Sequence, residues 1–211
     1  MKLLLFDDMT QCTENEVQRL LPLVSVQRRE QALRFKHLFG RFACLKSYEM
    51  LKHCVADTLA DETEDASLKE RLRRWNGLFV YNEHGKPFMQ DRYHEKKINA
   101  VDFSISHCKH AIAVALNSTA VGVDVESYRQ AEDSLLRKTM NDEEIATVVR
   151  SDNPEREFTR LWTQKEALLK MQGTGLVDEL PELLTASGVF STSRVQTIVN
   201  EEHLYVCTLI L

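Results

Sequence analysis

The sequence has little glycine and proline, with seven and four of them among 211 residues. Collagen-like and low-complexity chains are rich in these two residues, so both architectures are excluded. The chain also has no apolar run near the roughly 20 residues that a membrane-spanning helix needs. The apolar start, Lys2–Phe6, ends at Asp7 and Asp8. A signal peptide would continue to a small-residue cleavage site, so we expect a first β-strand there.

Cysteine is equally scarce, and none of the five cysteines forms a CxxC pair. An odd number without such pairs argues against a disulfide scaffold and against a zinc site. Together with the missing membrane span, this pattern predicts a cytoplasmic protein with reduced thiols and no membrane partner.

The chain is mildly acidic, with 27 Lys and Arg against 32 Asp and Glu and a net charge of −5. Nucleic-acid binders are usually basic, so we expect no nucleic-acid partner. Residues 26–54 depart from this balance, because seven Lys and Arg stand against two Glu and leave a local charge of +5. This basic segment is either a solvated helix face or an anion site.

Apolar residues at a spacing of three to four predict long helices over residues 28–56, 132–149 and 155–171. The first of them coincides with the basic segment. Residues 61–74 are strongly charged, and we expect a surface helix or loop there.

Short apolar and alternating segments predict the strands. Besides Lys2–Phe6 they are Leu78–Tyr81, two strands within 101–116 joined by a tight turn at 108–110, 121–126, 189–199 and 203–210; residues 82–87 have turn chemistry. The order of elements is similar in residues 1–117 and 118–211. We therefore expect an α+β fold that is a pseudo-twofold duplicate of two similar α/β halves, each with a small antiparallel sheet packed on a long helix.

Residues 121–126, VGVDVE, form the most informative segment. On a strand, Asp124 and Glu126 share one face with Gly122. Two carboxylates one strand repeat apart can share a hard divalent cation, and Gly122 leaves room for a bulky group beside them. The alternative is a half-exposed strand that places its charges in water, and spacing alone leaves both interpretations open.

Residues 158–170, FTRLWTQKEALLK, carry two stripes of a helix. Lys165 lies on the apolar stripe, which is unusual because burying an unpaired ammonium is costly. Trp162, Glu166 and Lys170 form the next stripe at i, i+4 and i+8. Glu166 and Lys170 are either a surface ion pair or an acidic metal ligand beside a phosphate-binding lysine.

Residues 103–107, FSISH, place Phe103, Ile105 and His107 on one face of a strand that ends at a turn. His107 is either structural or a hydrogen-bond donor to an anion. The chain contains no GxSxG, Walker A or GxGxxG motif, so hydrolase-elbow, P-loop and Rossmann chemistry have no support.

Taken together, these segments resemble the 4′-phosphopantetheinyl transferases of the Sfp type. FSISH at 103–107, GVDVE at 122–126 and WTQKEALLK at 162–170 follow one another in the order of that family. The start of the basic segment and Gly85-Lys86-Pro87 add two weaker matches. The resemblance implies that coenzyme A donates its phosphopantetheine arm to a serine of an apo acyl or peptidyl carrier protein and leaves 3′,5′-ADP. Family members look like two fused copies of a smaller synthase subunit, and this duplicated architecture suggests a monomer.

The resemblance also implies roles for single residues. Asp124, Glu126 and Glu166 would hold Mg²⁺ against the coenzyme A diphosphate, and Lys170 would contact the phosphates at the reacting centre. Glu144 would help to deprotonate the serine, although a metal-bound water could do the same. The further contacts to coenzyme A would be Arg28, Arg41, Gly85, Lys86, Pro87, Ser106, His107 and Lys165.

Two departures from the family pattern weaken the expected anion site. Gln31 stands where some relatives have a lysine, and Cys108 stands where a small hydroxyl residue is usual.

Two other functions also remain open. Another Mg²⁺-dependent transferase or hydrolase of a nucleotide diphosphate would explain the carboxylates and cations but not the order of the motifs. A non-catalytic module that binds coenzyme A or a carrier protein would be favoured by loss of Asp124 or Glu166, and both are present.

Overall fold

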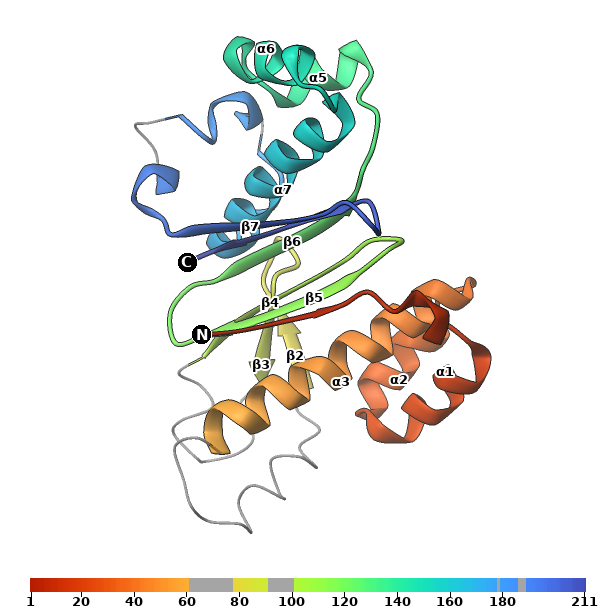
Figure 1. The fold of residues 1–211 in the computed structure, drawn as a ribbon. Helices are drawn as coiled ribbons and strands as arrows, with labels where there is room; N and C mark the ends of the chain where they lie inside the picture. The colour runs from red at the N-terminus through yellow and green to blue at the C-terminus, as the bar shows by residue number, and fades with distance from the viewer. Residues whose placement is uncertain (61–77, 91–100, 178, 186–188) are drawn as a thin grey trace.

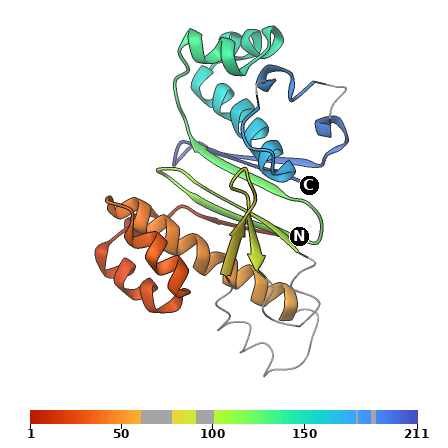
Figure 2. The same ribbon diagram turned by 180° about the vertical axis from the view of Figure 1, so that it is seen from behind.

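The computed structural model describes residues 1–60, 78–90, 101–177, 179–185 and 189–211. Its elements form four layers, with two small antiparallel sheets between helices (Figure 1). The reverse view in Figure 2 shows the same order of helix, sheet, sheet and helix. The fold therefore mixes helices with small antiparallel sheets, as an α+β class requires. The predicted helix or loop over 61–74 lies outside the described residues.

The first half contains one sheet and the helices that cover it. Its elements are β1 (Lys2–Phe6), η1 (Met9–Gln11), α1 (Glu14–Leu20), η2 (Leu21–Leu23), α2 (Val26–Leu33), α3 (Leu38–Ala60), β2 (Leu78–Tyr81), β3 (Pro87–Gln90), β4 (Asp102–His107) and β5 (Ile112–Asn117). The sheet has the order β1-β5-β4, and β2 and β3 form a separate hairpin. β1 confirms the predicted first strand, and β2 the strand over Leu78–Tyr81.

Residues 118–211 contain the other three-stranded sheet and its helices. The elements are β6 (Gly122–Ser127), α5 (Asp133–Thr139), α6 (Asp142–Arg150), α7 (Pro154–Gln172), η4 (Leu180–Glu182), η5 (Val189–Thr192), β7 (Val195–Asn200) and β8 (Tyr205–Ile210). The sheet has the order β6-β8-β7. In each sheet the strand that comes first along the chain, β1 or β6, precedes the helices. The strand that comes last along the chain, β5 or β8, lies in the middle of its sheet and pairs antiparallel with both neighbours.

The two sheets pack face to face. Along β5, Ile112 and Val114 belong to the core cluster that includes α3, whereas Ala113 and Ala115 belong to the cluster between the sheets. The valines of β6 form the other side of that second cluster. This alternation follows the pleat of the strand, and the small alanines let the sheets approach closely. α7 covers the outer face of the second sheet, where Ala167 and Leu168 pack with Ile210.

The single helix predicted over 28–56 is wrong, because the structure breaks it between α2 and α3. The Phe35 side chain folds back over Gly40, where a Cβ would come within 2.7 Å of the Phe35 ring. A side chain at position 40, in the first turn of α3, would therefore displace the Phe35 ring. Apolar spacing continues across this break because α2 and α3 contribute to the same core.

The helix predicted over 132–149 is also two helices. Asn141 caps the start of α6, since its side chain accepts from the Glu144 backbone N–H at 2.9 Å. The Glu144 carboxylate accepts in turn from the Asn141 backbone N–H at 3.0 Å. This capping box begins a new helix at a position that the apolar spacing alone does not mark. α7 agrees with the helix predicted over 155–171, extending it by one residue at each end.

The remaining strand predictions are confirmed with small shifts. β4 and β5 are the two strands expected within 101–116, and the Cys108 N–H closes their turn by donating to Ala111 O at 2.9 Å. The strand predicted over 189–199 is shorter, because residues 189–192 form the turn η5 and β7 begins at Val195. Among the helices of the described residues, none is long and apolar enough to cross a membrane.

Side chains join β4 to β6. The Val121 N–H donates to Asp102 Oδ2 at 3.0 Å, and the Val123 N–H donates to Ser104 Oγ at 3.0 Å. Ser106 Oγ then donates to Asp124 Oδ1 at 2.8 Å. Three alternate residues of β4 therefore hold β6, and we call this row of contacts the seam.

Candidate active site

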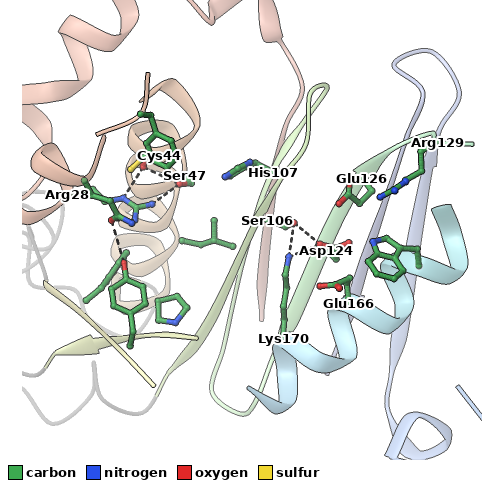
Figure 3. A pocket seen from close by; sticks show the side chains of 17 residues that line it. Arg28, Cys44, Ser47, Ser106, His107, Asp124, Glu126, Arg129, Glu166 and Lys170 are labelled. Carbon is green, nitrogen blue, oxygen red and sulfur yellow. Dashed lines mark hydrogen bonds and ion pairs between the residues drawn. The ribbon is translucent and has the colours of Figure 1, made fainter. Parts of the chain in front are cut away.

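A pocket of about 460 Å³ opens at the seam, with α2, α3 and the hairpin on one side and β6 and α7 on the other (Figure 3). It brings together eight of the thirteen residues predicted for the site. They are Arg28, Pro87, Ser106, His107, Asp124, Glu126, Glu166 and Lys170. Four of these residues come from the first part of the chain (Arg28 to His107), and four come from the second part (Asp124 to Lys170).

Arg28 forms one end of the pocket and is only 9% exposed. Its Nε donates to Cys44 O at 3.0 Å, and its Nη2 donates to Ser47 Oγ at 3.1 Å. Its Nη1 donates to Gln31 Oε1 at 3.0 Å, so the residue that replaces a family lysine helps to hold the guanidinium. The Phe79 ring lies 5.4 Å from the guanidinium carbon. These neutral partners fix the cation without cancelling its charge, which suits an anionic ligand.

His107 ends β4 and lies between Arg28 and Asp124 in Figure 3. Its ring packs edge-on against Phe39, with 5.8 Å between the ring centroids. Burial lowers the pKa of His107, and the nearby Lys170 ammonium lowers it further. The imidazole is therefore neutral at pH 7 and can donate one N–H to a phosphate oxygen.

Three polar groups meet at the middle of the pocket. The Lys170 Nζ lies 2.6 Å from Asp124 Oδ1 and 2.9 Å from Ser106 Oγ. Asp124 is 2% exposed, and its second oxygen, Oδ2, is buried with no hydrogen-bond partner among the described residues. A buried carboxylate oxygen without a partner is costly unless a ligand supplies one.

Two further carboxylates crowd the same space. Burial raises the pKa of Glu126 to about 7, and the charge of Asp124 adds to the rise. Burial and Asp124 also raise the pKa of the Glu166 carboxyl above its ordinary value. Glu126 and Glu166 are thus harder to ionise beside Asp124, as expected where a cation would relieve the repulsion between carboxylates.

The donor set of this pocket fits a hard divalent cation. Among the described residues, no group of three or more His, Cys, Asp or Glu side chains is arranged as a metal site. Mg²⁺, however, is usually held by only one or two protein carboxylates, with water and substrate phosphates completing its shell. The free Asp124 Oδ2 and the two glutamates that line the same pocket can meet that need.

A close contact between β6 and α7 positions the helix residues of the site. A Cβ on Gly122 would come within 1.8 Å of the Ala167 carbonyl oxygen, so backbone meets backbone there. Trp162, Glu166 and Lys170 all line the pocket, which confirms the predicted stripe at i, i+4 and i+8. The backbone of α7, the helix that carries Glu166, thus occupies the space that a side chain at position 122 would need.

The hairpin turn contributes to a neighbouring cavity of about 450 Å³, which shares Pro87, Glu166 and Lys170 with the pocket. Gly85 and Lys86 line this second cavity. Gly85 has φ of 84°, a conformation that favours glycine in the turn. Lys86 Nζ lies 2.6 Å from Asp102 Oδ2, so its ammonium anchors the turn to the seam.

Arg41 does not reach the pocket, contrary to the prediction. Its Nη2 donates to Glu14 Oε2 at 2.9 Å, in an ion pair between α3 and α1. Acidic residues of α1 and α3 likewise pair with other members of the basic segment, since Lys46 Nζ lies 2.8 Å from Glu49 Oε2. The local charge of +5 is therefore partly neutralised, and Arg28 is the member predicted for the site that lines the pocket.

Glu144 and Lys165 also lie outside the pocket lining. The Lys165 Nζ donates to Glu144 Oε2 at 2.8 Å in the interior between α6 and α7. Burial lowers the pKa of Lys165, while the Glu144 carboxylate opposes that shift. The predicted roles as phosphate contact and serine base do not agree with this placement, because both charged groups are turned toward each other.

Arg129, which was not among the residues predicted for the site, lines the pocket beyond Glu126 (Figure 3). Its guanidinium lies over the Phe158 ring at 6.0 Å, and Phe158 stacks on Trp162. The one feature of the sequence that could have indicated Arg129 is its position three residues after Glu126. Ser47 was missed because nothing in the sequence indicates that one face of α3 turns toward Arg28.

Comparisons with known proteins identify chains that are similar to this one. The model of the 4′-phosphopantetheinyl transferase superfamily matches residues 120–207, which carry Asp124, Glu126, Glu166 and Lys170. The 4′-phosphopantetheinyl transferase ffp of Bacillus subtilis is 24% identical over 193 residues, covering 90% of this chain and 78% of the relative.

Two other relatives carry the same kind of name. The 4′-phosphopantetheinyl transferase Sfp of Bacillus subtilis strain 168 is 23% identical, over 78% of this chain and 66% of the relative. The 4′-phosphopantetheinyl transferase HetI of Nostoc sp. is 31% identical, over 56% of this chain and 51% of the relative. These matches confirm the enzyme class predicted from the sequence, and they show that the chain is similar to the 4′-phosphopantetheinyl transferase superfamily, most directly over residues 120–207.

Proposed function

We propose that this chain transfers the 4′-phosphopantetheine arm of coenzyme A to a serine of an apo acyl or peptidyl carrier protein. The serine oxygen forms a bond to the β-phosphorus of coenzyme A, and the bond from that phosphorus to the bridging oxygen breaks. The serine proton passes to a base, and 3′,5′-ADP leaves. The proposal rests on the similarity of the chain to this superfamily and on one observation: a single pocket holds a buried arginine at one end and a lysine with three carboxylates beyond it.

The arginine end suits the nucleotide part of coenzyme A. Arg28 keeps its charge among neutral partners, and His107 can donate a hydrogen bond beside it. We assign the 3′-phosphate to these two residues, with Ser106 nearby. Pro87 lines the same pocket and Gly85 and Lys86 line the adjoining cavity, so the hairpin turn is assigned to the adenine side.

The carboxylate end suits the diphosphate with its cation. Asp124, Glu126 and Glu166 would hold Mg²⁺, which would neutralise phosphate charge and polarise the reacting phosphoryl group when bound. Lys170 already lies 2.6 Å from Asp124 Oδ1, so it is within reach of a phosphate bound beside that carboxylate. The Lys170 ammonium, held at a fixed position, would then stabilise the negative charge that develops on the transferred and departing phosphates.

The architecture supports a second part of the proposal. We infer that residues 1–117 and 118–211 are two copies of one ancestral unit, because both sheets share strand order and connectivity. The inner sheet faces cover each other, so neither half needs a second chain to complete its core, and we propose a monomer. The first half would hold the nucleotide, and the second would supply the metal carboxylates and α7.

The experiment is the intact mass of an apo acyl carrier protein after incubation with this protein, coenzyme A and Mg²⁺. A gain of one phosphopantetheine, lost with EDTA and restored by excess Mg²⁺, is the expected result. Apo carriers from fatty-acid and from peptide synthesis should both be offered. If coenzyme A binds by calorimetry but no carrier gains mass, the chain is a binding module and the proposal is wrong.

A further inference from the structure

One buried ion pair lies behind the pocket. Lys165 is fully buried, and its Nζ is 2.8 Å from Oε2 of Glu144, which is 8% exposed. The same ammonium donates to the carbonyl oxygens of Leu180 at 2.7 Å and Pro181 at 3.2 Å. One side chain of α7 therefore joins the start of α6 and the turn η4.

The partners of this pair are fixed as well. Glu144 Oε2 also accepts from the Asn141 N–H at 3.0 Å, and Asn141 Nδ2 donates to Pro181 O at 3.2 Å. The contacts form a closed loop through Asn141, Glu144, Lys165 and Pro181. A slip of α7 by one residue would leave an ammonium and a carboxylate unpaired in the interior, which is strongly unfavourable.

The pair acts on the pocket through the helix. Lys165 and Glu166 are consecutive, so their side chains leave α7 about 100° apart. With Lys165 held against α6 and η4, Glu166 is turned toward the pocket, and Lys170 follows one turn later on the same side. We propose that Glu144 and Lys165 are a positioning pair, which sets the rotation of α7 and so places Glu166 and Lys170. The effect that we expect this pair to have on turnover rests on the proposed function.

The same geometry argues that Glu144 does not take the serine proton. A general base must reach that proton directly or through one water, and Glu144 does not line the pocket. Its Oε2 is engaged by Asn141 and by the Lys165 ammonium, and its Oε1 is buried with no hydrogen-bond partner among the described residues.

The variant E144Q separates positioning from base catalysis. Its side-chain oxygen can accept from both Asn141 and Lys165, as Glu144 Oε2 does, but it cannot take a proton. We expect kcat to fall less than about 10-fold and the pH profile of kcat/KM to keep its shape. General bases contribute about 100-fold to 10,000-fold. A fall of about 100-fold or more in folded E144Q, with a changed pH profile, would overturn the proposal.

The variant K165M removes the ammonium, and E144M/K165M replaces the whole pair by apolar side chains. If K165M does not fold, the double variant leaves no unpaired charge and takes its place. We expect kcat to fall at least 30-fold, with the dissociation constant for coenzyme A changing less than 3-fold because Arg28 lies elsewhere. A folded double variant with wild-type kcat would overturn the proposal.

The matched control is R160M, which removes the ion pair of Arg160 with Glu157 (2.6 Å) on the same helix. This pair does not contact η4, so kcat should stay within 2-fold of wild type. A loss in R160M equal to that in K165M would mean that any lost ion pair on α7 has the same effect, and the proposal would be wrong.

Hydrogen exchange tests the positioning without turnover. Backbone amides of residues 162–170 and of η4 should exchange at least 10-fold faster in the Lys165 variants than in wild type, and R160M should leave them unchanged. If wild type transfers no phosphopantetheine, the proposed function fails, and the exchange rates still decide on the positioning pair. Unchanged exchange in the Lys165 variants would overturn it.

Discussion

The Lys170 ammonium and the Ser106 hydroxyl both contact the same oxygen of Asp124, at 2.6 and 2.8 Å. Residues of β4, β6 and α7 thus converge on one carboxylate, whose other oxygen is buried and available to a ligand. The geometry of the pocket depends on Asp124 more directly than on any other acidic residue of the set.

Asp124→Asn tests this dependence. Asparagine keeps the shape but removes the negative charge that would hold a cation, so phosphopantetheine transfer should fall at least about 100-fold. Lys170 is partly exposed and can turn to water, so the protein should remain folded. Intact carrier mass reports transfer, and a thermal melt reports folding. Asp133→Asn, on exposed α5, is the control. An active and folded Asp124→Asn enzyme would remove the metal assignment.

Arg28→Met tests the nucleotide end. The change removes the buried cation assigned to the 3′-phosphate, and we expect coenzyme A to bind about 10-fold to 100-fold more weakly. Dephospho-coenzyme A lacks that phosphate, so its affinity should change little. Calorimetry with both ligands makes the comparison. The exposed Arg34→Met is the matched control, and equal losses for the two ligands would contradict the assignment.

Gly122→Ala tests the contact between β6 and α7. The new Cβ would lie 1.8 Å from the Ala167 carbonyl oxygen, so the strand and the helix must separate. We expect the free energy of unfolding to fall by about 3 kcal/mol or more. At Gly85 a Cβ would meet nothing within 4 Å, and only the positive φ is strained. Gly85→Ala should therefore cost only about 1 kcal/mol. Denaturant titrations of both variants decide, and equal costs would refute the argument.

The thiols should react unequally. Burial raises the pKa of the Cys54 thiol to about 11 and that of Cys207 to about 12, and it raises those of Cys44 and Cys108 as well. At pH 8 these groups carry little reactive thiolate. Burial also raises the pKa of the Cys12 thiol, but Cys12 is only half-buried and is therefore accessible to a reagent.

Ellman's reagent at pH 8 should therefore modify one thiol of the native protein quickly and all five after denaturation. Cys12→Ser should remove the fast reaction. Several fast thiols in native protein would show that the core around α3 and β8 opens readily.

The sequence was sufficient where the chemistry depends on local periodicity. Asp124 and Glu126 share a strand face, and Trp162, Glu166 and Lys170 share a helix face, because the repeats of two and 3.6 residues place them so. Those motifs lie in regular elements whose type the apolar pattern also predicts. The residues of the pocket centre were therefore predictable from both halves of the chain.

Failures occurred where long-range contacts decide. Arg41 is drawn to Glu14 on another helix, and Lys165 is drawn to Glu144. Neither partner can be identified from spacing, since 27 and 21 residues separate the two pairs. The break at Phe35 has the same origin, because it depends on how α2 and α3 meet rather than on the sequence of either helix.

The seam joins its two strands through side chains. Strands joined by a backbone ladder are held about 4.8 Å apart whatever their sequence. Here Ser104 and Ser106 set the distance between β4 and β6, so the length of two side chains fixes the separation. Both serines are buried, so a longer residue at either position would push β4 from β6 only by straining the packing between the two sheets. The position of Ser106 relative to Asp124 therefore depends on side-chain hydrogen bonds and not on a backbone ladder.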